Sequence, residues 1–198
     1  MTADDAVTEH YAQPELLTAI ERAVGRIGKT PDTVTVDELA PADEFHIGGR
    51  PATVHLFDQL AFEPEAHLLD VGCGIGGSAR FAAGRVERIT GVDLTPAFVE
   101  TGNALNRWVG LDDRIELRVG NALVLDFPDA HFDGGYMIHV GMNIEDKRAL
   151  LAEVARVLRP GGLFGIYDVM AASPGDLAFP LPWAGDATTS HVAEPAQY

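Results

Sequence analysis

The residue pattern with the clearest chemical meaning is a glycine-rich turn over residues 68–80, LLDVGCGIGGSAR. Glycines at this spacing allow a tight turn and a close approach of the backbone to a ligand, and they fit a pyrophosphate-binding turn as well as other nucleotide-binding loops. Asp70 stands two positions before the first glycine, Gly72. A carboxylate there would repel a pyrophosphate and favour a cation, directly or through water. The alternative is that Asp70 only orders the backbone amides of the loop.

A second acidic residue, Asp93, ends the next apolar segment, RITGVDL at residues 88–94. Its carboxylate can accept hydrogen bonds from both hydroxyls of a ribose, and Leu94 beside it can pack against an adenine. Proteins that bind NAD place an acid in the same way, so Asp93 does not discriminate between nucleotide ligands. In the alternative interpretation, Asp93 is exposed and caps the helix that Thr95 and Pro96 begin.

Two histidines are candidates for proton transfer, because a histidine can titrate near neutral pH. His139 follows the fourth predicted strand and is the first candidate; the alternative is that it hydrogen-bonds a backbone carbonyl or shapes a pocket. His46, in DEFHIGG, is the second, and a structural role is favoured there. A metal site is not expected, because the histidines and acids lack any compact ligand spacing.

Other polar and aromatic residues are candidates for contacts with a bound small molecule. Tyr167 and Asp168 end the fifth predicted strand, and Phe179 and Trp183 could form aromatic walls in the segment after it. The alternative for both aromatic residues is that they anchor this segment on the core. Asn143, in GMNI, is interpreted as the cap of the helix that begins near Glu145.

Hydrophobic periodicity indicates the elements that must position these residues. A helical stripe covers residues 14–28, residues 29–49 read as a loop or short turns, and a second helix covers 52–60. Short apolar runs that end at glycines or acids then alternate with helical segments, which predicts an α/β fold with a doubly wound, Rossmann-like parallel sheet. The predicted strands are 67–72, 88–94, 114–120, 132–139 and 163–170, and the helices between them are 78–83, 96–109 and 145–158.

Composition narrows the classes of function. The chain has 198 residues, 46% of them hydrophobic, and a formal net charge of −16. Such an acidic chain without a basic run argues against binding to nucleic acid or to an anionic membrane. The single cysteine, Cys73, rules out an intramolecular disulfide. With no apolar run long enough to span a membrane and no signal-peptide pattern, we expect a cytoplasmic protein.

Four blocks in order carry a resemblance to a known family: LLDVGCGIGGSARFAA, GVDLTPAFVE, FPDAHFDGGYMIHVGMNI and ARVLRPGGLFGIYDVM. Together they resemble the class I S-adenosylmethionine-dependent methyltransferases. The resemblance covers roughly residues 45–185 and is nearest to the small-molecule group, which contains the sarcosine/dimethylglycine N-methyltransferases and the ubiquinone/menaquinone C-methyltransferases. It implies S-adenosylmethionine as the cofactor, S-adenosylhomocysteine as its product, and NAD as a distant alternative.

The resemblance also implies roles for individual residues. Gly72 and Gly74 would meet the methionine end of the cofactor with Asp70 nearby, and the segment from Met137 to His139 would lie beside the reacting methyl group. Asn121 and Ala122 match the pair that contacts the adenine, although similar enzymes usually have Asp in place of Asn121. An N-terminal tyrosine, Tyr11, would fold over the cofactor. The substrate contacts would come from His46, Tyr167 and Trp183, with His139 as the catalytic base.

The same resemblance divides the chain and marks where the pattern breaks. Residues 1–60 would form a helical cap over the site, 61–170 the cofactor-binding core, and 171–198 a lid-like loop. Similar enzymes continue with a helix and two more strands, so we expect a C-terminally truncated form whose edge strand could pair in a homodimer. A methyltransferase for a small amine, carbon acid or oxygen acid is the main hypothesis. The alternative is a cofactor-binding module without turnover, and the sequence does not identify the methyl acceptor.

Overall fold

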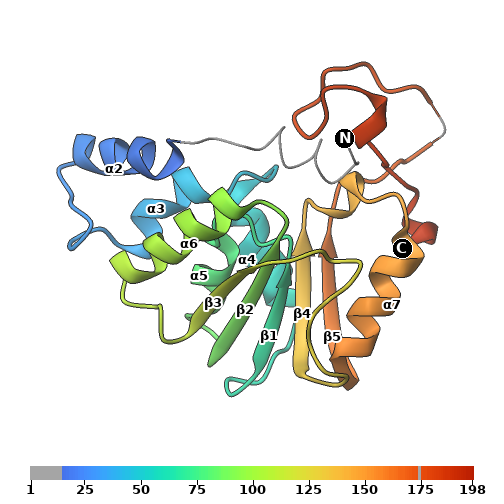
Figure 1. The fold of residues 1–198 in the computed structure, drawn as a ribbon, viewed down its shortest axis with the longest axis horizontal. Helices are drawn as coiled ribbons and strands as arrows, with labels where there is room; N and C mark the ends of the chain where they lie inside the picture. Colours follow the sequence, from blue (N-terminus) through green and yellow to red (C-terminus); the bar gives the residue numbers. More distant parts are fainter. Residues whose placement is uncertain (1–14, 174) are drawn as a thin grey trace.

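Five parallel strands in the order β3-β2-β1-β4-β5 organise the molecule (Figure 1). The computed structural model describes residues 15–173 and 175–198. Every neighbouring pair of strands is parallel, which requires crossover connections and confirms the predicted doubly wound sheet. The strands are β1 (His67–Val71), β2 (Arg88–Asp93), β3 (Ile115–Val119), β4 (Phe132–Ile138) and β5 (Leu158–Tyr167).

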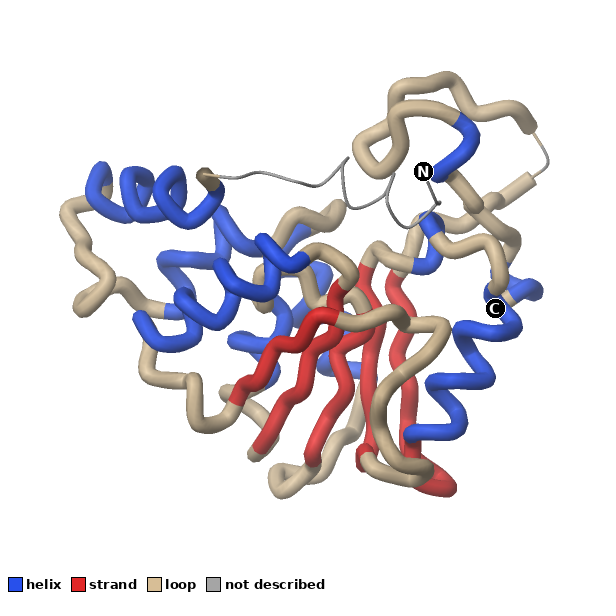
Figure 2. Tube along the Cα trace, viewed as in Figure 1, coloured by secondary structure: helices blue, strands red, loops and turns tan. Residues whose placement is uncertain are grey.

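Helices cover both faces of this sheet (Figures 1 and 2). Successive residues of a strand point to opposite faces, and in β1 Leu68 and Leu69 accordingly belong to two different core clusters. The first cluster packs against α4, α5 and α6, and the second against α7. The helices are α2 (Leu16–Arg26), α3 (Val36–Asp43), α4 (Gly49–Gln59), α5 (Gly77–Ala82), α6 (Pro96–Trp108) and α7 (Lys147–Val157).

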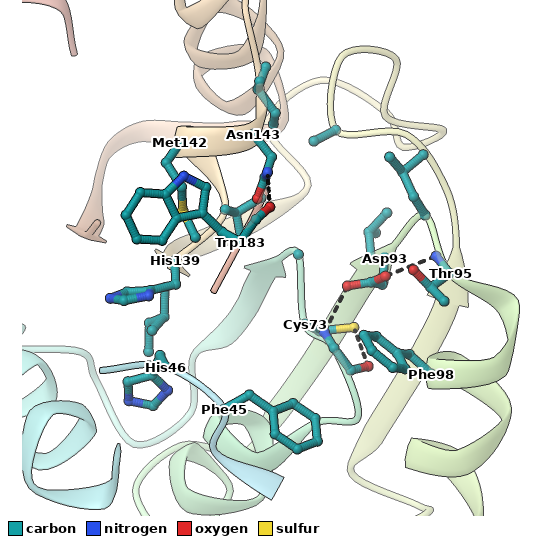
Figure 3. A pocket seen from close by; sticks show the side chains of 18 of the residues that line it. Phe45, His46, Cys73, Asp93, Thr95, Phe98, His139, Met142, Asn143 and Trp183 are labelled. Carbon is teal, nitrogen blue, oxygen red and sulfur yellow. Dashed lines mark hydrogen bonds between the residues drawn. The ribbon is translucent and has the colours of Figure 1, made fainter. Parts of the chain in front are cut away.

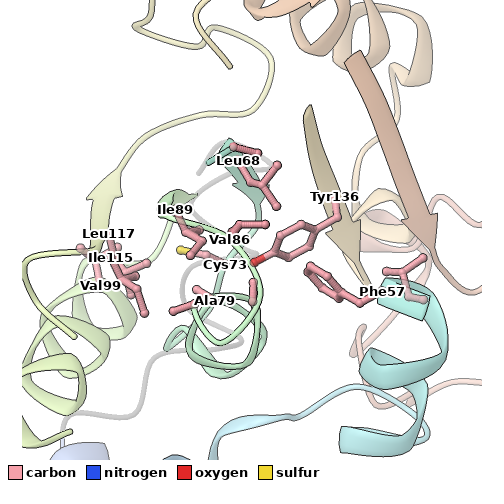
Figure 4. Packing of buried hydrophobic residues seen from close by; sticks show 14 residues of the cluster. Phe57, Leu68, Cys73, Ala79, Val86, Ile89, Val99, Ile115, Leu117 and Tyr136 are labelled. Atoms are coloured by element: carbon pink, nitrogen blue, oxygen red, sulfur yellow. The ribbon is translucent and has the colours of Figure 1, made fainter. Parts of the chain in front are cut away.

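Figure 4 shows the first cluster at close range, with Tyr136 of β4 packed against Phe57 of α4. Their rings lie 4.8 Å apart at 69°, an edge-to-face arrangement. Val86, Ile89 and Cys73 continue the cluster toward β3. This packing fixes α4, and therefore the segment that leads into it, against the central strands.

The prediction that residues 29–49 form only a loop or short turns is wrong, because α3 lies within them. The helix begins with a capping box, in which Thr35 accepts a hydrogen bond from the backbone of Glu38 and the Glu38 carboxylate accepts one from the backbone of Thr35. This reciprocal pair satisfies two amides that the start of a helix leaves unbonded. Pro41 inside the helix obscures it in the sequence.

The fifth strand begins earlier than predicted, at Leu158 instead of residue 163, because Leu158 already pairs with Phe132 of β4. A register shift follows between Phe132 and Gly134, in the stretch where the RPGG sequence interrupts the ladder. After β5, residues 168–173 and 175–198 contain the short 3-10 helices η2 (Ala187–Thr189) and η3 (Pro195–Gln197) and no further strand. This C-terminal segment runs above the carboxyl ends of the strands (Figure 2).

Candidate functional site

A cavity of about 620 Å³ opens at the carboxyl ends of β1, β2 and β4 (Figure 3). Its walls are completed by Asp43 at the end of α3, by residues 44–47 between α3 and α4, and by the C-terminal segment. Parallel sheets with helices on both faces hold ligands at this position, where the order of the strands reverses. Most of the predicted site residues line it: His46, Gly72, Gly74, Asp93, Leu94, Asn121, Ala122, His139 and Trp183.

The glycine-rich turn adopts a backbone that only glycine takes without strain. Gly72, Gly74 and Gly76 have φ angles of 70°, 53° and 80°. A Cβ on Gly72 would overlap the side chain of Val140, whereas a Cβ on Gly74 would meet no atom within 4 Å. The first glycine thus allows two loops to pack, and the second exposes backbone to the cavity.

Asp93 joins the turn to the end of β2. One carboxylate oxygen accepts a hydrogen bond from the Gly74 amide at 2.8 Å, and the other accepts one from the Thr95 amide at 2.9 Å. Burial raises the pKa of Asp93, while these two amide donors act in the opposite direction. Its carboxyl group is held in one orientation at the cavity wall, and it is not the exposed side chain of the alternative interpretation.

Asp70 does not line the cavity. It is buried in β1 and accepts hydrogen bonds at 2.9 Å from the Ser78 hydroxyl and from the Tyr136 hydroxyl. Burial raises the pKa of Asp70 to about 7. Asp70 therefore bonds hydroxyl groups and not the amides of the loop. Because its carboxyl group is partly protonated at neutral pH, it offers a cation little attraction.

The loop after β3 supplies the pair predicted to contact an adenine. Asn121 and Ala122 line the cavity opposite the turn that contains Leu94. The side-chain oxygen Oδ1 of Asn121 accepts a hydrogen bond from the Leu123 backbone amide at 2.8 Å, which closes a local turn. This bond explains how an Asn can replace the usual Asp without loss of the loop conformation.

His139 lies at the end of β4 with a φ of 56°, an unusual value for a residue other than glycine. Its amide donates to the Tyr167 carbonyl at 2.8 Å, and its ring stacks on Tyr167 with centroids 5.4 Å apart. Burial, and then the nearby His46, lower the pKa of His139 to about 4. The imidazole is therefore neutral at physiological pH and able to accept a proton.

His46 faces His139 with ring centroids 5.9 Å apart (Figure 3). Its Nε2 lies 3.0 Å from the Gly49 carbonyl, which can only accept, so Nε2 carries the proton and donates. Burial lowers the pKa of His46. Tyr167 is outside the cavity lining and packs behind both imidazoles, and its hydroxyl donates to the Ile47 carbonyl at 3.2 Å.

Met137 and Asp168 do not line the cavity either. Met137 is fully buried in the cluster beneath α7 and does not line the site. Tyr11 lies outside the described residues, so its predicted role stays a prediction. Asp168, after β5, accepts a hydrogen bond from the Tyr198 hydroxyl at 2.7 Å and so ties down the C-terminal segment.

The C-terminal segment packs over the mouth of the cavity. Trp183 lines the cavity and belongs to a small cluster with Met142, Ala184 and Phe179. The Asn143 side chain donates to the carbonyls of Trp183 and Thr189, each at 2.8 Å. The interpretation of Asn143 as a helix cap is wrong, because the Asp146 side chain caps α7.

Sequence reasoning missed several residues that line the cavity: Phe45, Phe98, Met142 and His191. Phe45 is next to His46 and could have been inferred with it. No local signal marks Met142, because only the return of the C-terminal segment makes it part of a wall. Among residues 15–173 and 175–198, no group of three or more His, Cys, Asp or Glu could hold a metal ion, and no helix is long and apolar enough to cross a membrane.

Comparisons with known proteins match this chain to methyltransferases. Residues 69–166 match the family described as "Methyltransferase domain". The chain is 40% identical over 117 residues to 24-methylenesterol C-methyltransferase 2 of Oryza sativa subsp. japonica, an alignment that covers 59% of this chain and 32% of that protein. It is 31% identical to the methyltransferase GfsG of Streptomyces halstedii, over 83% of this chain and 58% of that protein.

Solved structures are similar over the same core. Geranyl diphosphate methyltransferase in complex with S-adenosylmethionine matches with a TM-score of 0.57 and 32% identity, covering 59% of this chain and 48% of that chain. The [4+2]-cyclase SpnF matches with a TM-score of 0.70 over 99% of this chain and 68% of its own, and its 23% identity shows the fold alone. The chain spans about a third of the length of the plant sterol methyltransferase.

Proposed function

Because this chain belongs to the class I S-adenosylmethionine-dependent methyltransferases, we propose that it transfers the methyl group of S-adenosylmethionine to a small-molecule acceptor. The observation that carries the proposal is a single cavity with the glycine turn and Asp93 on one side and two neutral imidazoles on the other. When bound, the cofactor supplies an electrophilic methyl group on its sulfonium, and S-adenosylhomocysteine is the product.

The residues on the first side fit the cofactor. The open side of Gly74 would receive its methionine end, and Asp93, whose oxygens keep lone pairs beyond the two amides, would accept from the ribose hydroxyls. Leu94, Asn121 and Ala122 would enclose the adenine. The lining contains carboxylates and, among the described residues, no Lys or Arg, a charge balance that suits a cation and opposes the pyrophosphate of NAD.

His139 is proposed as the general base. Its neutral imidazole can take the proton that the acceptor loses, and its position is fixed by the backbone bond to Tyr167. His139→Asn removes the base, and asparagine tolerates the left-handed backbone. We expect kcat to fall by roughly 10²–10⁴-fold while the affinity for the cofactor is unchanged. Tyr167→Phe, which loses only the bond to the Ile47 carbonyl, is the matched control.

Calorimetric titration with S-adenosylmethionine and S-adenosylhomocysteine tests the cofactor, with NAD as the negative control. We expect saturable binding that Asp93→Ala abolishes and that Asp112→Ala, at an exposed acid, leaves intact. A folded protein that does not bind either compound would contradict the proposal. Binding without any acceptor being methylated would favour the alternative of a cofactor-binding module.

We also propose an oligomeric state and a cellular location for the protein. β5 pairs with β4 alone in the described sheet, so its other edge is open to a second copy of the chain. We expect light scattering to give the mass of a homodimer.

The one cysteine, Cys73, is a free buried thiol, which is compatible with a cytoplasmic location. Cell fractionation would test that location.

A further inference from the structure

The cavity has two chemically different sides (Figure 3). Cys73, Asp93, Thr95 and Phe98 lie on the side assigned to the cofactor. His46, His139, Met142 and Trp183 lie across from them, and we refer to these four residues as the acceptor wall. The acceptor wall consists of two imidazoles, a thioether and an indole, so its surface is mainly apolar.

A negatively charged group on the acceptor would find no Lys or Arg side chain among the described residues that line this cavity. The lining includes Asp43, Glu44, Asp93, Glu145 and Asp146, and no Lys or Arg from the described residues. A buried anion without a counter-charge is strongly disfavoured. Within the described ranges, no group of three or more His, Cys, Asp or Glu is arranged to hold a metal ion.

The cations that pack behind the lining are already paired. Arg80 is buried and holds Asp43 through two hydrogen bonds of 3.1 and 2.8 Å. Arg50 lies 2.7 Å from the Glu44 carboxylate. The Lys147 ammonium donates to the carbonyls of Ile144 and His191. A phosphate or carboxylate on the acceptor would meet these cations only behind the lining, where Arg80 and Arg50 already face carboxylates.

The two imidazoles require an acceptor that gives up a proton. The Nε2 of His46 already donates to the Gly49 carbonyl, and the lowered pKa values leave both imidazoles uncharged at neutral pH, each with one nitrogen that carries no proton. A hydroxyl group can enter uncharged and donate to an unprotonated imidazole nitrogen. An amine would enter as an ammonium, and the carboxylates of the lining would favour that protonated form, which has no lone pair with which to attack.

We propose that the methyl acceptor is an uncharged, mainly apolar molecule with one weakly acidic hydroxyl group, a phenol or an enol, and that the cavity discriminates against anionic acceptors such as diphosphates. This inference rests on the proposed function. The acceptor oxygen forms its bond to the methyl carbon as the bond from that carbon to sulfur breaks, with the electron pair left on sulfur. The hydroxyl proton passes to the imidazole of His139.

Matched probes test the inference on the protein saturated with S-adenosylhomocysteine. We would titrate 2-naphthol, 6-hydroxynaphthalene-2-sulfonate and geranyl diphosphate calorimetrically at pH 7.5. The first two differ by one fixed negative charge. We expect 2-naphthol to bind saturably and each anion to bind at least about tenfold more weakly. An anion that binds as tightly as 2-naphthol, or no binding of 2-naphthol, would overturn the proposal.

Turnover with S-adenosylmethionine provides the second readout. We expect the methyl ether of 2-naphthol as product, detected by mass spectrometry, and no methylation of 2-naphthylmethylamine at the same pH. Preferential methylation of the amine would overturn the proposal. Cofactor binding is measured first: its absence counts against the proposed function, whereas cofactor binding with the opposite order of acceptors counts against this inference alone.

A charge-gain variant tests the physical cause. Ile47 lines the cavity and is 59% exposed, so a long cationic side chain can be accommodated there. We expect Ile47→Arg to raise the affinity for the sulfonate about tenfold while leaving that for 2-naphthol unchanged, and Ile47→Gln to change neither. If Ile47→Arg binds the sulfonate as weakly as the native protein, a missing positive charge is not the reason for the discrimination, and the proposal fails.

Discussion

At the scale of single residues, the role of His139 as general base can be tested through the pH dependence of turnover. Burial and the neighbouring His46 lower the pKa of His139 to about 4, so the neutral imidazole persists down to that pH. An unperturbed histidine would lose its basic form below about pH 6.5. With 2-naphthol as acceptor, we expect kcat/KM to stay flat from pH 8 to about pH 5.5. An acid limb centred near pH 6.5 that is lost in His139→Asn would show that the pKa of His139 is not lowered, and a limb near pH 6.5 that persists in His139→Asn would show that another group is the base.

The glycine turn is best tested at the scale of the element, by comparing two glycines that differ in their surroundings. Gly72→Ala adds a Cβ that overlaps Val140, at a φ of 70°. We expect overpacking and backbone strain to lower the free energy of unfolding by about 2–5 kcal/mol in urea titrations. In Gly74→Ala the new Cβ has no atom within 4 Å, so only backbone strain should lower the free energy of unfolding, by about 1–2 kcal/mol.

A second substitution separates the two causes. Val140→Ala in the Gly72→Ala background removes the overlapping methyl groups, and we expect it to restore part of the lost stability. For Gly74→Ala, the loss in free energy of cofactor binding should exceed the loss in free energy of unfolding, because the new methyl group lies at the cavity wall. Equal stability losses for the two single variants would contradict the packing role assigned to Gly72.

The C-terminal segment provides the second prediction at this scale. Asn143 holds the carbonyls of Trp183 and Thr189, so Asn143→Ala should release residues 181–192 from the cavity mouth. Hydrogen exchange followed by mass spectrometry should show faster exchange in that stretch alone. Asn103→Ala, which removes bonds between α6 and β3 instead, is the control and should leave the stretch unchanged. Unaltered exchange in Asn143→Ala would mean that the Trp183 cluster holds the segment by itself.

These elements also show what a sequence can and cannot predict. The strand ends at Asp93 and His139 and the turn at Gly72 follow from local patterns, because glycine spacing and short apolar runs are encoded within a few residues. Contacts between distant parts of the sequence leave no such local pattern. Asp70 bonds Tyr136, and Asn143 bonds Thr189, only because the chain folds back. Local patterns therefore predict a ligand contact for Asp70 and a helix cap for Asn143, although both side chains bond distant parts of the chain.

At the scale of the whole molecule, Asp70 links β1 to the start of α5 through Ser78 and to β4 through Tyr136. Burial raises its pKa to about 7, against 3.8 for an unperturbed Asp. Between these values the native state holds a proton that the unfolded chain has released. Raising the pH through this window therefore lowers the free energy of unfolding, by up to about 4 kcal/mol for a shift of this size.

Replacement of Asp70 isolates this contribution from that of the histidines. The lowered pKa values of His67 and His139 act in the opposite direction, since they favour the native state as the pH rises above about 4. These histidines are common to the native protein and Asp70→Asn, so their effect cancels in the difference between the two. We expect Asp70→Asn to gain stability relative to the native protein as urea titrations move from pH 4.5 to pH 7.5. Asp112→Asn, at an exposed site, should give no such trend, and parallel profiles for Asp70→Asn would mean that Asp70 is ionised throughout this range in the folded protein.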